Sequence, residues 1–215
     1  MHADLGHYLA MARRYDMRTR LRQVEATRAE IVAAAHALLD GDKSHSLTLD
    51  EVARAAGVSR ATVYNQFGSR RQLLAAVFED QGRLIRYDRV QAAMALPDPR
   101  AALAEGLREL ARAWSSRPKA IRRVLALAVV DPEIAELVAR YERYRRAEIA
   151  ALAGRLDDAG LLGHGVSTSE AAAILGALTG FSVFDALAFE SGKRAALQRL
   201  VHTVFSSLGV DPQPK

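Results

Sequence analysis

Cysteine is absent from this chain of 215 residues. Its absence excludes disulfide bonds, thiolate nucleophiles and zinc sites built on thiolates, and it is typical of proteins in a reducing cytosol. The sequence has no apolar run long enough to cross a bilayer, and no stretch that resembles a secretory signal. We therefore expect a cytoplasmic protein with no membrane partner.

The sequence motifs of common enzymes are also missing. There is no glycine-rich phosphate loop, no HExxH and no GxSxG. The six histidines include no pair at the spacing of helical metal ligands, so we expect no metal site and no cofactor. These absences predict that the chain has no catalytic residues and is not an enzyme.

Basic charge is denser at the front of the chain. The formal net charge is +5 at pH 7. Residues 1–71 contain 11 Lys and Arg against 8 Asp and Glu, whereas residues 72–215 contain 19 against 17. A basic N-terminal part and a nearly balanced C-terminal part indicate that only the N-terminal part meets a polyanion.

Two short helical patterns meet at a glycine within Thr48–Phe67. In the first pattern apolar residues recur at three- and four-residue spacing, and Thr48 with Glu51 forms a capping box at its start. Gly57 suits the left-handed turn that ends this helix, and Ser59 is a second N-cap. The spacing predicts a helix-turn-helix.

The second of these helices presents polar side chains outward, as a helix in the major groove of DNA requires. The bare spacing also fits an ordinary helical corner. However, Val52–Phe78 contains four arginines and no carboxylate, which favours a surface that meets phosphates. The predicted DNA-binding residues are Thr48, Ser59, Arg60, Ala61, Thr62, Tyr64, Asn65, Gln66 and Arg70.

Three stretches resemble the DNA-binding domain of the TetR family of bacterial transcriptional regulators. They read TRAEIVAAAHALL, LTLDEVARAAGVSRATVYNQF and GSRRQLLAAV, and the resemblance covers about the first third of the chain. Its most specific feature is the pair Tyr64 and Phe67 followed by a short turn and a new helix. The resemblance implies binding to double-stranded operator DNA as a homodimer whose last two helices form the interface.

The sequence departs from the family pattern at a few positions. Leu39 stands where the family often has an aromatic residue, and Asn65 with Gln66 replaces commoner bulky or basic residues. These differences should alter packing or sequence preference. Arg70 stands where the family usually has a lysine that binds a phosphate, and it keeps the charge.

Apolar spacing is helical along the whole chain, so we predict an all-α fold of about nine helices. We expect a basic, flexible N-terminal arm at residues 1–22, which is either a solvated tail or reaches phosphates or the minor groove. A three-helix DNA-binding domain at residues 23–70 follows, with its first helix at Thr27–Leu39. The larger helical domain for effector binding and dimerisation is expected at residues 71–215.

In this rear domain the fourth helix should continue past Ile85 to a break at Gln91–Pro99. Near the C-terminus a single helix should span residues 171–189, with a turn at Ser191 and Gly192 before the last helix. Gly176 and Gly180 would then lie on a small-residue face where another backbone approaches closely. The predicted dimer-interface residues are Ile174, Gly176, Leu178, Gly180, Leu197, Val201, Val204 and Phe205.

The layout of the family implies a common interior in the rear domain, where residues either bind a small ligand or form plain core. The candidate ligand-binding residues are Phe78, Trp114, Leu125, Tyr141, Phe181 and Phe184. Asp185 is the only charge between Ala171 and Phe189, and it faces solvent, caps a dimer contact or pairs with a cationic ligand group.

The sequence thus predicts a DNA-binding transcriptional regulator, a repressor that a small hydrophobic or amphipathic ligand releases from its operator. The alternative is an architectural DNA-binding protein, or a regulator, that has no small-molecule effector.

Overall fold

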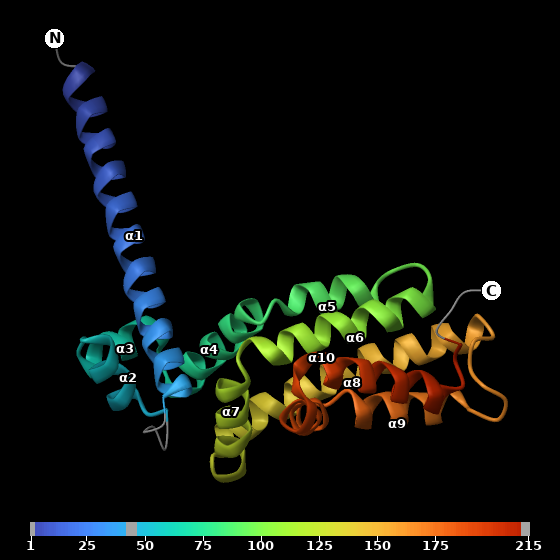
Figure 1. Ribbon diagram of the computed structural model, residues 1–215. Helices are drawn as coiled ribbons and strands as arrows, with labels where there is room; N and C mark the ends of the chain where they lie inside the picture. The colour runs from blue at the N-terminus through green and yellow to red at the C-terminus, as the bar shows by residue number, and fades with distance from the viewer. Residues whose placement is uncertain (1–2, 42–46, 212–215) are drawn as a thin grey trace. The chain divides into compact units, whose positions relative to one another are not determined.

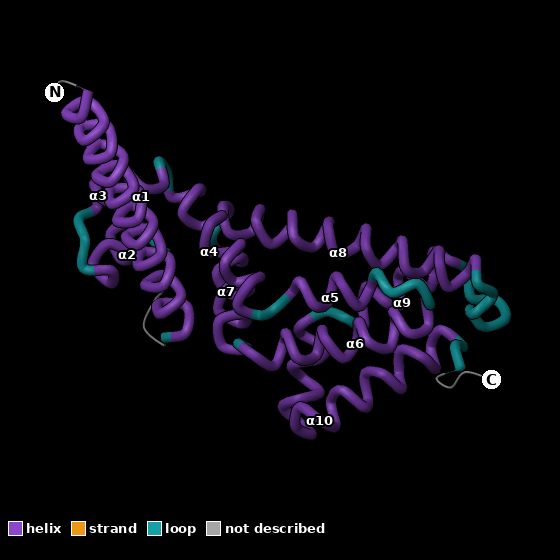
Figure 2. Tube along the Cα trace, turned by 90° about the horizontal axis from the view of Figure 1, so that it is seen from above, coloured by secondary structure: helices purple, strands orange, loops and turns teal. Residues whose placement is uncertain are grey.

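The structure is a computed structural model that describes residues 3–41 and 47–211, with side chains from residue 19 onward. The described residues form ten α-helices and no strand (Figures 1 and 2), which confirms the all-α prediction with one helix more than expected. The helices are α1 (Ala3–Asp40), α2 (Leu49–Ala56), α3 (Arg60–Phe67), α4 (Arg70–Leu84), α5 (Tyr87–Met94), α6 (Pro99–Ser116), α7 (Pro118–Val130), α8 (Pro132–Asp158), α9 (Thr168–Leu178) and α10 (Phe181–Leu208).

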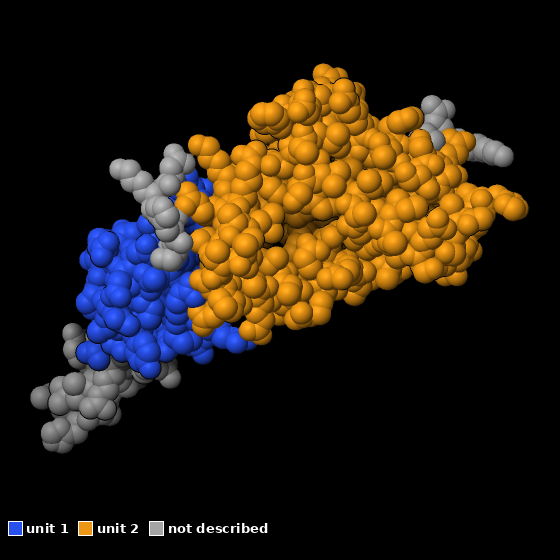
Figure 3. All heavy atoms as spheres, turned by 90° about the horizontal axis from the view of Figure 1, so that it is seen from below, with its two compact units in different colours: residues 1–77 blue, residues 78–215 orange. Residues whose placement is uncertain are grey.

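The chain divides into two compact units, residues 1–77 and 78–215 (Figure 3). The boundary lies inside α4, beyond the predicted end of the DNA-binding domain at residue 70. The reason lies in the apolar face of α4, where Leu73, Leu74 and Val77 are all buried. These residues belong to the first unit, so the first half of α4 is part of that unit's core.

Helix α1 is much longer than the predicted helix at Thr27–Leu39. Residues 3–22, expected as a flexible arm, are helical and continuous with the rest of α1 (Figure 1). The first proline of the chain is Pro97, and residues 3–22 are rich in Ala, Leu, Met and Arg, which favour helix. The side chains of Arg13, Arg14 and Arg18 lie outside the described residues, so phosphate contact by this segment stays a prediction.

In the first unit α1 packs on α2 and α3, and α2 packs on α3. The core is formed by residues that are at most 4% exposed, among them Ile31, Leu39, Val52, Val63 and Phe67. Leu39 therefore fills a core position where the related pattern often has an aromatic residue. This small core fixes α3 against α1 and α2.

The predicted fourth helix is interrupted at Arg86, which has a left-handed backbone with φ of 57° and separates α4 from α5. Helix α5 (Tyr87–Met94) then extends four residues into the break expected at Gln91–Pro99. Ile85 and Val90 are both buried. In a continuous helix residues five apart lie about 140° apart around the axis, so the turn at Arg86 allows both side chains to enter the core.

The expected single helix at residues 171–189 is also divided. Helix α9 ends at Leu178, and Gly180 takes an extended conformation before α10. Thr179 and Gly180 are weak helix formers, which favours a break at this point. The predicted turn at Gly192 is observed as a kink inside α10, with φ of 76°. Gly180 is therefore outside the helices and cannot lie on a helical face with Gly176.

In the second unit α6 packs against α5, α8 and α10, while α8 also packs against α7 and α9. Their buried faces form one core that includes Trp114, Phe181 and Phe184. Within the described ranges no single helix is both long and apolar enough to cross a membrane. Only α9 and α10 together, bent by 52° at their junction, meet that criterion of length and composition.

Candidate DNA-binding surface and ligand cavity

The start of α2 is fixed by the predicted capping box. The Thr48 amide donates to Glu51 Oε2 at 3.0 Å, and the Glu51 amide donates to Thr48 Oγ1 at 3.2 Å. Gly57 ends α2 in the left-handed conformation, with φ of 67°. Ser59 Oγ then accepts from the Thr62 amide at 3.0 Å and caps α3. These contacts confirm the helix-turn-helix and give Thr48 and Ser59 structural roles.

Helix α3 turns one face into the core and one face to solvent. Val63 and Phe67 are 0% and 4% exposed, whereas Tyr64 is 57% exposed. The other predicted residues of this helix follow the same division: Arg60, Ala61 and Asn65 are exposed, and Thr62 and Gln66 are partly buried. The outward face is therefore available to a partner, and DNA contact by these residues stays a prediction.

Arg60, at the start of the predicted recognition helix, has an acidic neighbour. Its Nη1 lies 3.4 Å from Asp50 Oδ2, and both side chains are more than half exposed. Asp50 lies just before the carboxylate-free stretch of the sequence, and the fold of α2 and α3 brings it beside Arg60. In the free protein this carboxylate reduces the positive charge of the surface.

Arg70 has a structural contact in addition to its predicted phosphate contact. Its Nε donates to the Leu47 carbonyl at 2.8 Å, and the side chain is partly buried. The bond joins the start of α4 to the segment before α2. A loss of Arg70 would therefore change the stability of the first unit as well as its charge.

Arg28 of α1 was not among the predicted site residues. Its guanidinium carbon lies 4.2 Å from the centroid of the Phe67 ring, and Nη1 donates to the Gln66 carbonyl at 2.8 Å. The last carbonyls of a helix need donors from outside the helix, and Arg28 supplies one to α3. The sequence signal that could have predicted this contact is the position of Arg28, one turn before the buried Ile31 on the same helix.

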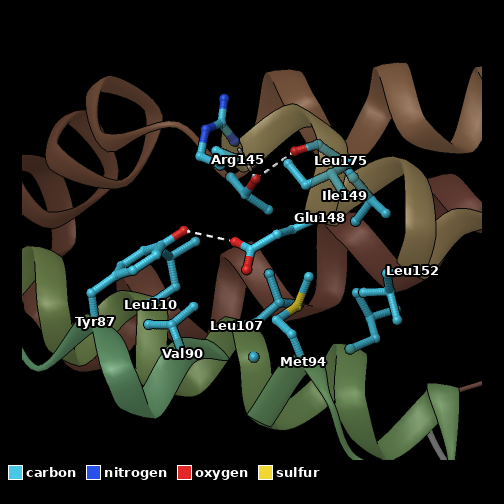
Figure 4. Close-up of a pocket in the computed structure, with 13 residues that line it drawn as sticks. Tyr87, Val90, Met94, Leu107, Leu110, Arg145, Glu148, Ile149, Leu152 and Leu175 are labelled. Atoms are coloured by element: carbon cyan, nitrogen blue, oxygen red, sulfur yellow. Dashed lines mark hydrogen bonds between the residues drawn. The ribbon is translucent and has the colours of Figure 1, made fainter. Parts of the chain in front are cut away.

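A cavity of about 40 Å³ lies in the second unit between α5, α6, α8 and α9 (Figure 4). Its wall is mostly apolar, with Val90, Met94, Leu103, Leu107, Leu110, Ile149, Leu152 and Leu175. The polar groups of the lining are Tyr87, Arg145, Glu148 and Thr179. A largely apolar wall with few polar groups resembles that of a small-molecule site, but the volume is far below the roughly 300–1,000 Å³ of such sites.

The polar groups fall into two sets of hydrogen bonds. Tyr87 Oη donates to Glu148 Oε2 at 3.2 Å, and the two side chains point toward each other in Figure 4. Burial is the main cause of the raised pKa of Tyr87, with further contributions from Tyr141 and Glu148. The phenol therefore stays protonated and acts as a donor. Arg145 forms the second set, with Glu142 and Thr179.

None of the six predicted ligand-binding residues lines this cavity. Trp114 and Phe181 pack edge to face at 5.7 Å between centroids, and Phe184 is buried in the same core. Leu125 and Phe181 line a separate surface groove on α7 and α10. Tyr141 packs edge to face on Tyr87 at 5.5 Å, and Phe78 is partly buried. Sequence reasoning missed the cavity because its polar residues come from helices distant in the chain.

Asp185 forms an ion pair with Arg122 of α7, at 2.7 Å from Nε to Oδ2 and 2.8 Å from Nη2 to Oδ1. This contact ties α10 to α7 within one chain, and it differs from the three environments considered for Asp185 from the sequence. The pair is geometrically bidentate, which fixes both side chains.

The predicted dimer residues differ in how much surface they offer. Ile174, Leu178, Leu197 and Val201 are partly exposed in a single chain, as are the two glycines Gly176 and Gly180. By contrast, Val204 and Phe205 are 0% and 3% exposed and belong to the core of their own chain. Within one chain these two residues therefore offer little surface, although Phe205 also lines a groove with Leu197 and Val201, and their part in a dimer stays a prediction.

Helix α3 is capped and exposed, and the described residues form only helices. These features are those of the helix-turn-helix class of DNA-binding regulators. The family model of bacterial regulatory proteins of the tetR family matches residues 31–77. The chain is 30% identical over 146 residues to the HTH-type transcriptional regulator BetI of Agrobacterium fabrum, a match of 65% of this chain and 71% of that protein. It is 31% identical over 125 residues to BetI of Rhizobium meliloti, and this match spans 57% of the chain and 62% of that relative.

Solved structures support the fold over most of the chain. A TetR transcription regulator from Haloarcula marismortui has a TM-score of 0.66 and 20% identity, covering 86% of this chain and 97% of that one. NalD, described as the secondary repressor of the MexAB-OprM multidrug efflux pump in Pseudomonas aeruginosa, has a TM-score of 0.64 and 21% identity, with the same coverage. The chain belongs to the TetR family of bacterial DNA-binding transcriptional regulators.

Proposed function

We propose that the protein represses transcription by binding an operator as a homodimer, and that a small amphipathic molecule releases it. The observation that supports operator binding most directly is the outward face of α3. Its caps and its buried Val63 and Phe67 fix the helix, while Tyr64 remains 57% exposed. In this proposal the protein acts in the cytoplasm, where the DNA is, and performs no catalysis of its own.

Two DNA-binding units, one from each protomer and called heads below, are needed to read an operator of this kind. A two-fold dimer reads half-sites about 34–36 Å apart, one helical turn of DNA, or a multiple of that spacing. The partly exposed apolar residues of α9 and α10 supply a surface for such a dimer, namely Ile174, Leu178, Leu197 and Val201. The operator should accordingly be an inverted repeat.

Release by a ligand requires a site that differs between the bound and the released state. The cavity next to α5 is a candidate for this site, because its lining residue Tyr87 directly follows Arg86, the residue that separates α4 from α5. Helix α4 belongs to both units, so a change at its end has a covalent route to the DNA-binding unit. A ligand shifts this equilibrium only by its differential affinity, and operator DNA must weaken the ligand by the same factor.

Operator binding can be tested by selecting bound fragments from random or genomic DNA and then titrating the selected site at fixed salt. We expect an inverted repeat, and an affinity that falls with salt by about 0.9 log–log units for each phosphate contact. A screen of metabolites against the titration then tests release. If no metabolite changes the affinity, the architectural alternative without an effector is favoured.

The variant Tyr64→Ala tests the recognition face directly. We expect it to weaken operator binding by roughly tenfold, equivalent to about 1.4 kcal/mol, with no change in thermal unfolding because the side chain is exposed. Tyr144→Ala is a matched control, since Tyr144 is 50% exposed in the second unit. Equal operator affinity of the two variants would remove Tyr64 from the DNA-binding surface.

A further inference from the structure

Helix α3 is short, and its two ends are held in different ways. It has eight residues, about two turns. At its N-terminus the Ser59 side chain accepts a hydrogen bond from the Thr62 amide at 3.0 Å, a contact within one turn of the chain. At its C-terminus the Gln66 carbonyl accepts from Arg28 Nη1 at 2.8 Å. The C-terminal end of α3 therefore depends on a residue 38 positions away in the sequence.

Arg28 also contacts the last side chain of α3. Its guanidinium carbon lies 4.2 Å from the centroid of the Phe67 ring, a cation–π contact. Phe67 is 4% exposed and anchors the end of α3 in the core of the first unit. One guanidinium thus holds a ring and a backbone carbonyl of the same turn. The planar group of arginine, with its fixed fork of donors, suits this double contact, whereas a lysine ammonium is a point charge.

The backbone that carries Arg28 is itself held in place. Arg28 lies on α1 one turn before Ile31, which is 0% exposed, and α1 packs on both α2 and α3. Figure 1 shows the C-terminal half of α1 beside α3. The preceding residues 19–26 are all exposed, so Arg28 stands close to the point where α1 enters the core. A contact made from a packed helix positions its target more precisely than a contact made from a loop.

The turn of α3 that Arg28 holds also carries two outward side chains, Tyr64 and Asn65. Tyr64 is 57% exposed, and Asn65 is exposed as well. They lie in the same turn as Gln66 and Phe67, so a shift of the helix end moves them together with the carbonyl and the ring. Hydrogen bonds to base edges weaken steeply with misalignment. Any contact of this turn with bases therefore depends on how firmly its end is held.

We propose that Arg28 is a positioning residue for sequence-specific DNA binding, which fixes the C-terminal turn of α3 so that Tyr64 and Asn65 reach base edges in the correct geometry. Arg28 acts through α3, and this role is separate from the positive charge that it adds to the surface. The inference rests on the proposed binding of an operator through α3. It adds a residue of α1 to the parts of the molecule that determine sequence preference.

The experiment compares Arg28→Met with the wild type in titrations of the selected operator and of a scrambled duplex of the same length. Methionine keeps an unbranched, flexible side chain and removes the charge and the donors. We expect the ratio of operator affinity to scrambled-duplex affinity to fall by at least roughly fivefold, as for the loss of one good base contact. The log–log salt slope for the operator should stay unchanged, because no phosphate contact is lost.

Arg54→Met is the matched control, since Arg54 is exposed on α2 of the same unit. This variant removes the same charge and should leave the ratio of the two affinities unchanged. If Arg28→Met does not fold, Arg28→Lys takes its place, because lysine keeps the charge and lacks the planar group. The ratio should then fall in the same direction by a smaller factor.

Three results would overturn the proposal. One is an unchanged affinity ratio in the Arg28 variant. Another is an equal fall of both affinities with a salt slope flatter by about 0.9 for each head, which would make Arg28 a phosphate contact. The third is a fall of both affinities in proportion to the unfolded fraction seen by circular dichroism, which would leave only a structural role. The proposed function fails separately, when the wild type itself does not distinguish the two duplexes.

Discussion

At the scale of single residues, the charge of the proposed DNA-binding surface has two sources. One is the run of arginines visible in the sequence, and the other is an ion pair that forms only on folding. The stretch from Val52 to Phe78 has arginines and no carboxylate. Folding nevertheless brings Asp50 to 3.4 Å from Arg60. Since a phosphate competes with Asp50 for Arg60, this pair should lower DNA affinity while leaving the fold intact.

We therefore expect Asp50→Asn to tighten operator binding by about fivefold at low salt, because an exposed pair contributes about 0.2–1 kcal/mol and the dimer has two. The measurement is an operator titration at several salt concentrations. Asp88→Asn is the matched control, since Asp88 forms a comparable exposed pair with Arg86 at 3.5 Å in the second unit. Unchanged or weaker binding by Asp50→Asn would show that the pair does not compete with phosphate.

At the scale of helices, backbone conformation at single glycines decides where elements end. Gly57 has φ of 67°, and Gly82 lies within α4. A methyl group built on either residue has no atom within 4 Å. The two glycines therefore differ only in backbone conformation, and alanine at each position isolates that effect.

We expect Gly57→Ala to destabilise the protein by about 1–2 kcal/mol, the cost of a left-handed residue with a side chain. Gly82→Ala should stabilise it by about 0.5–1 kcal/mol through its helix preference. Thermal unfolding followed by circular dichroism measures both, and fluorescence of Trp114, the single tryptophan, reports the second unit separately. Effects of the same sign on the two variants would contradict the conformational argument.

Helices with local signals could be predicted from the sequence, and those set by distant contacts could not. Thr48 and Ser59 cap their helices as predicted, because a cap depends on residues within one turn, and Asp98, Asp131 and Ser167 form caps of the same kind. The break at Arg86 has no such signal, since a left-handed arginine is uncommon and results from packing.

The same distinction applies to the site. The outward face of α3 follows from helical periodicity, so the exposure of Tyr64 could be predicted from the sequence. The pair Tyr87 and Glu148 is separated by 61 residues, and only the packing of α5 on the bundle brings the two side chains together. Of the candidate ligand residues predicted from the sequence, Trp114, Phe181 and Phe184 belong to the core, and none of the six lines the cavity.

At the scale of the whole molecule, the proposed repression depends on a dimer that positions two heads. On α9, Ala173 and Ala177 are exposed in a single chain beside Gly176. A methyl group built on Gly176 meets no atom within 4 Å, and the same holds for Gly154 of α8. Small exposed residues allow a second helix to approach closely. Because Gly180 lies outside the helices, Gly176 is the better position to test this contact.

Gly176→Leu should produce a monomer that is folded, since leucine favours helix and a methyl group built at this position meets no atom within 4 Å. Sedimentation measures the mass, and an operator titration should show a loss of roughly a hundredfold, because avidity between two linked heads is lost. Gly154→Leu is the matched control and should remain dimeric with unchanged affinity. A dimeric Gly176→Leu protein would place the interface away from α9. A monomeric variant with full operator affinity would instead remove the dimer from the repression mechanism, because one head would then suffice to hold the operator.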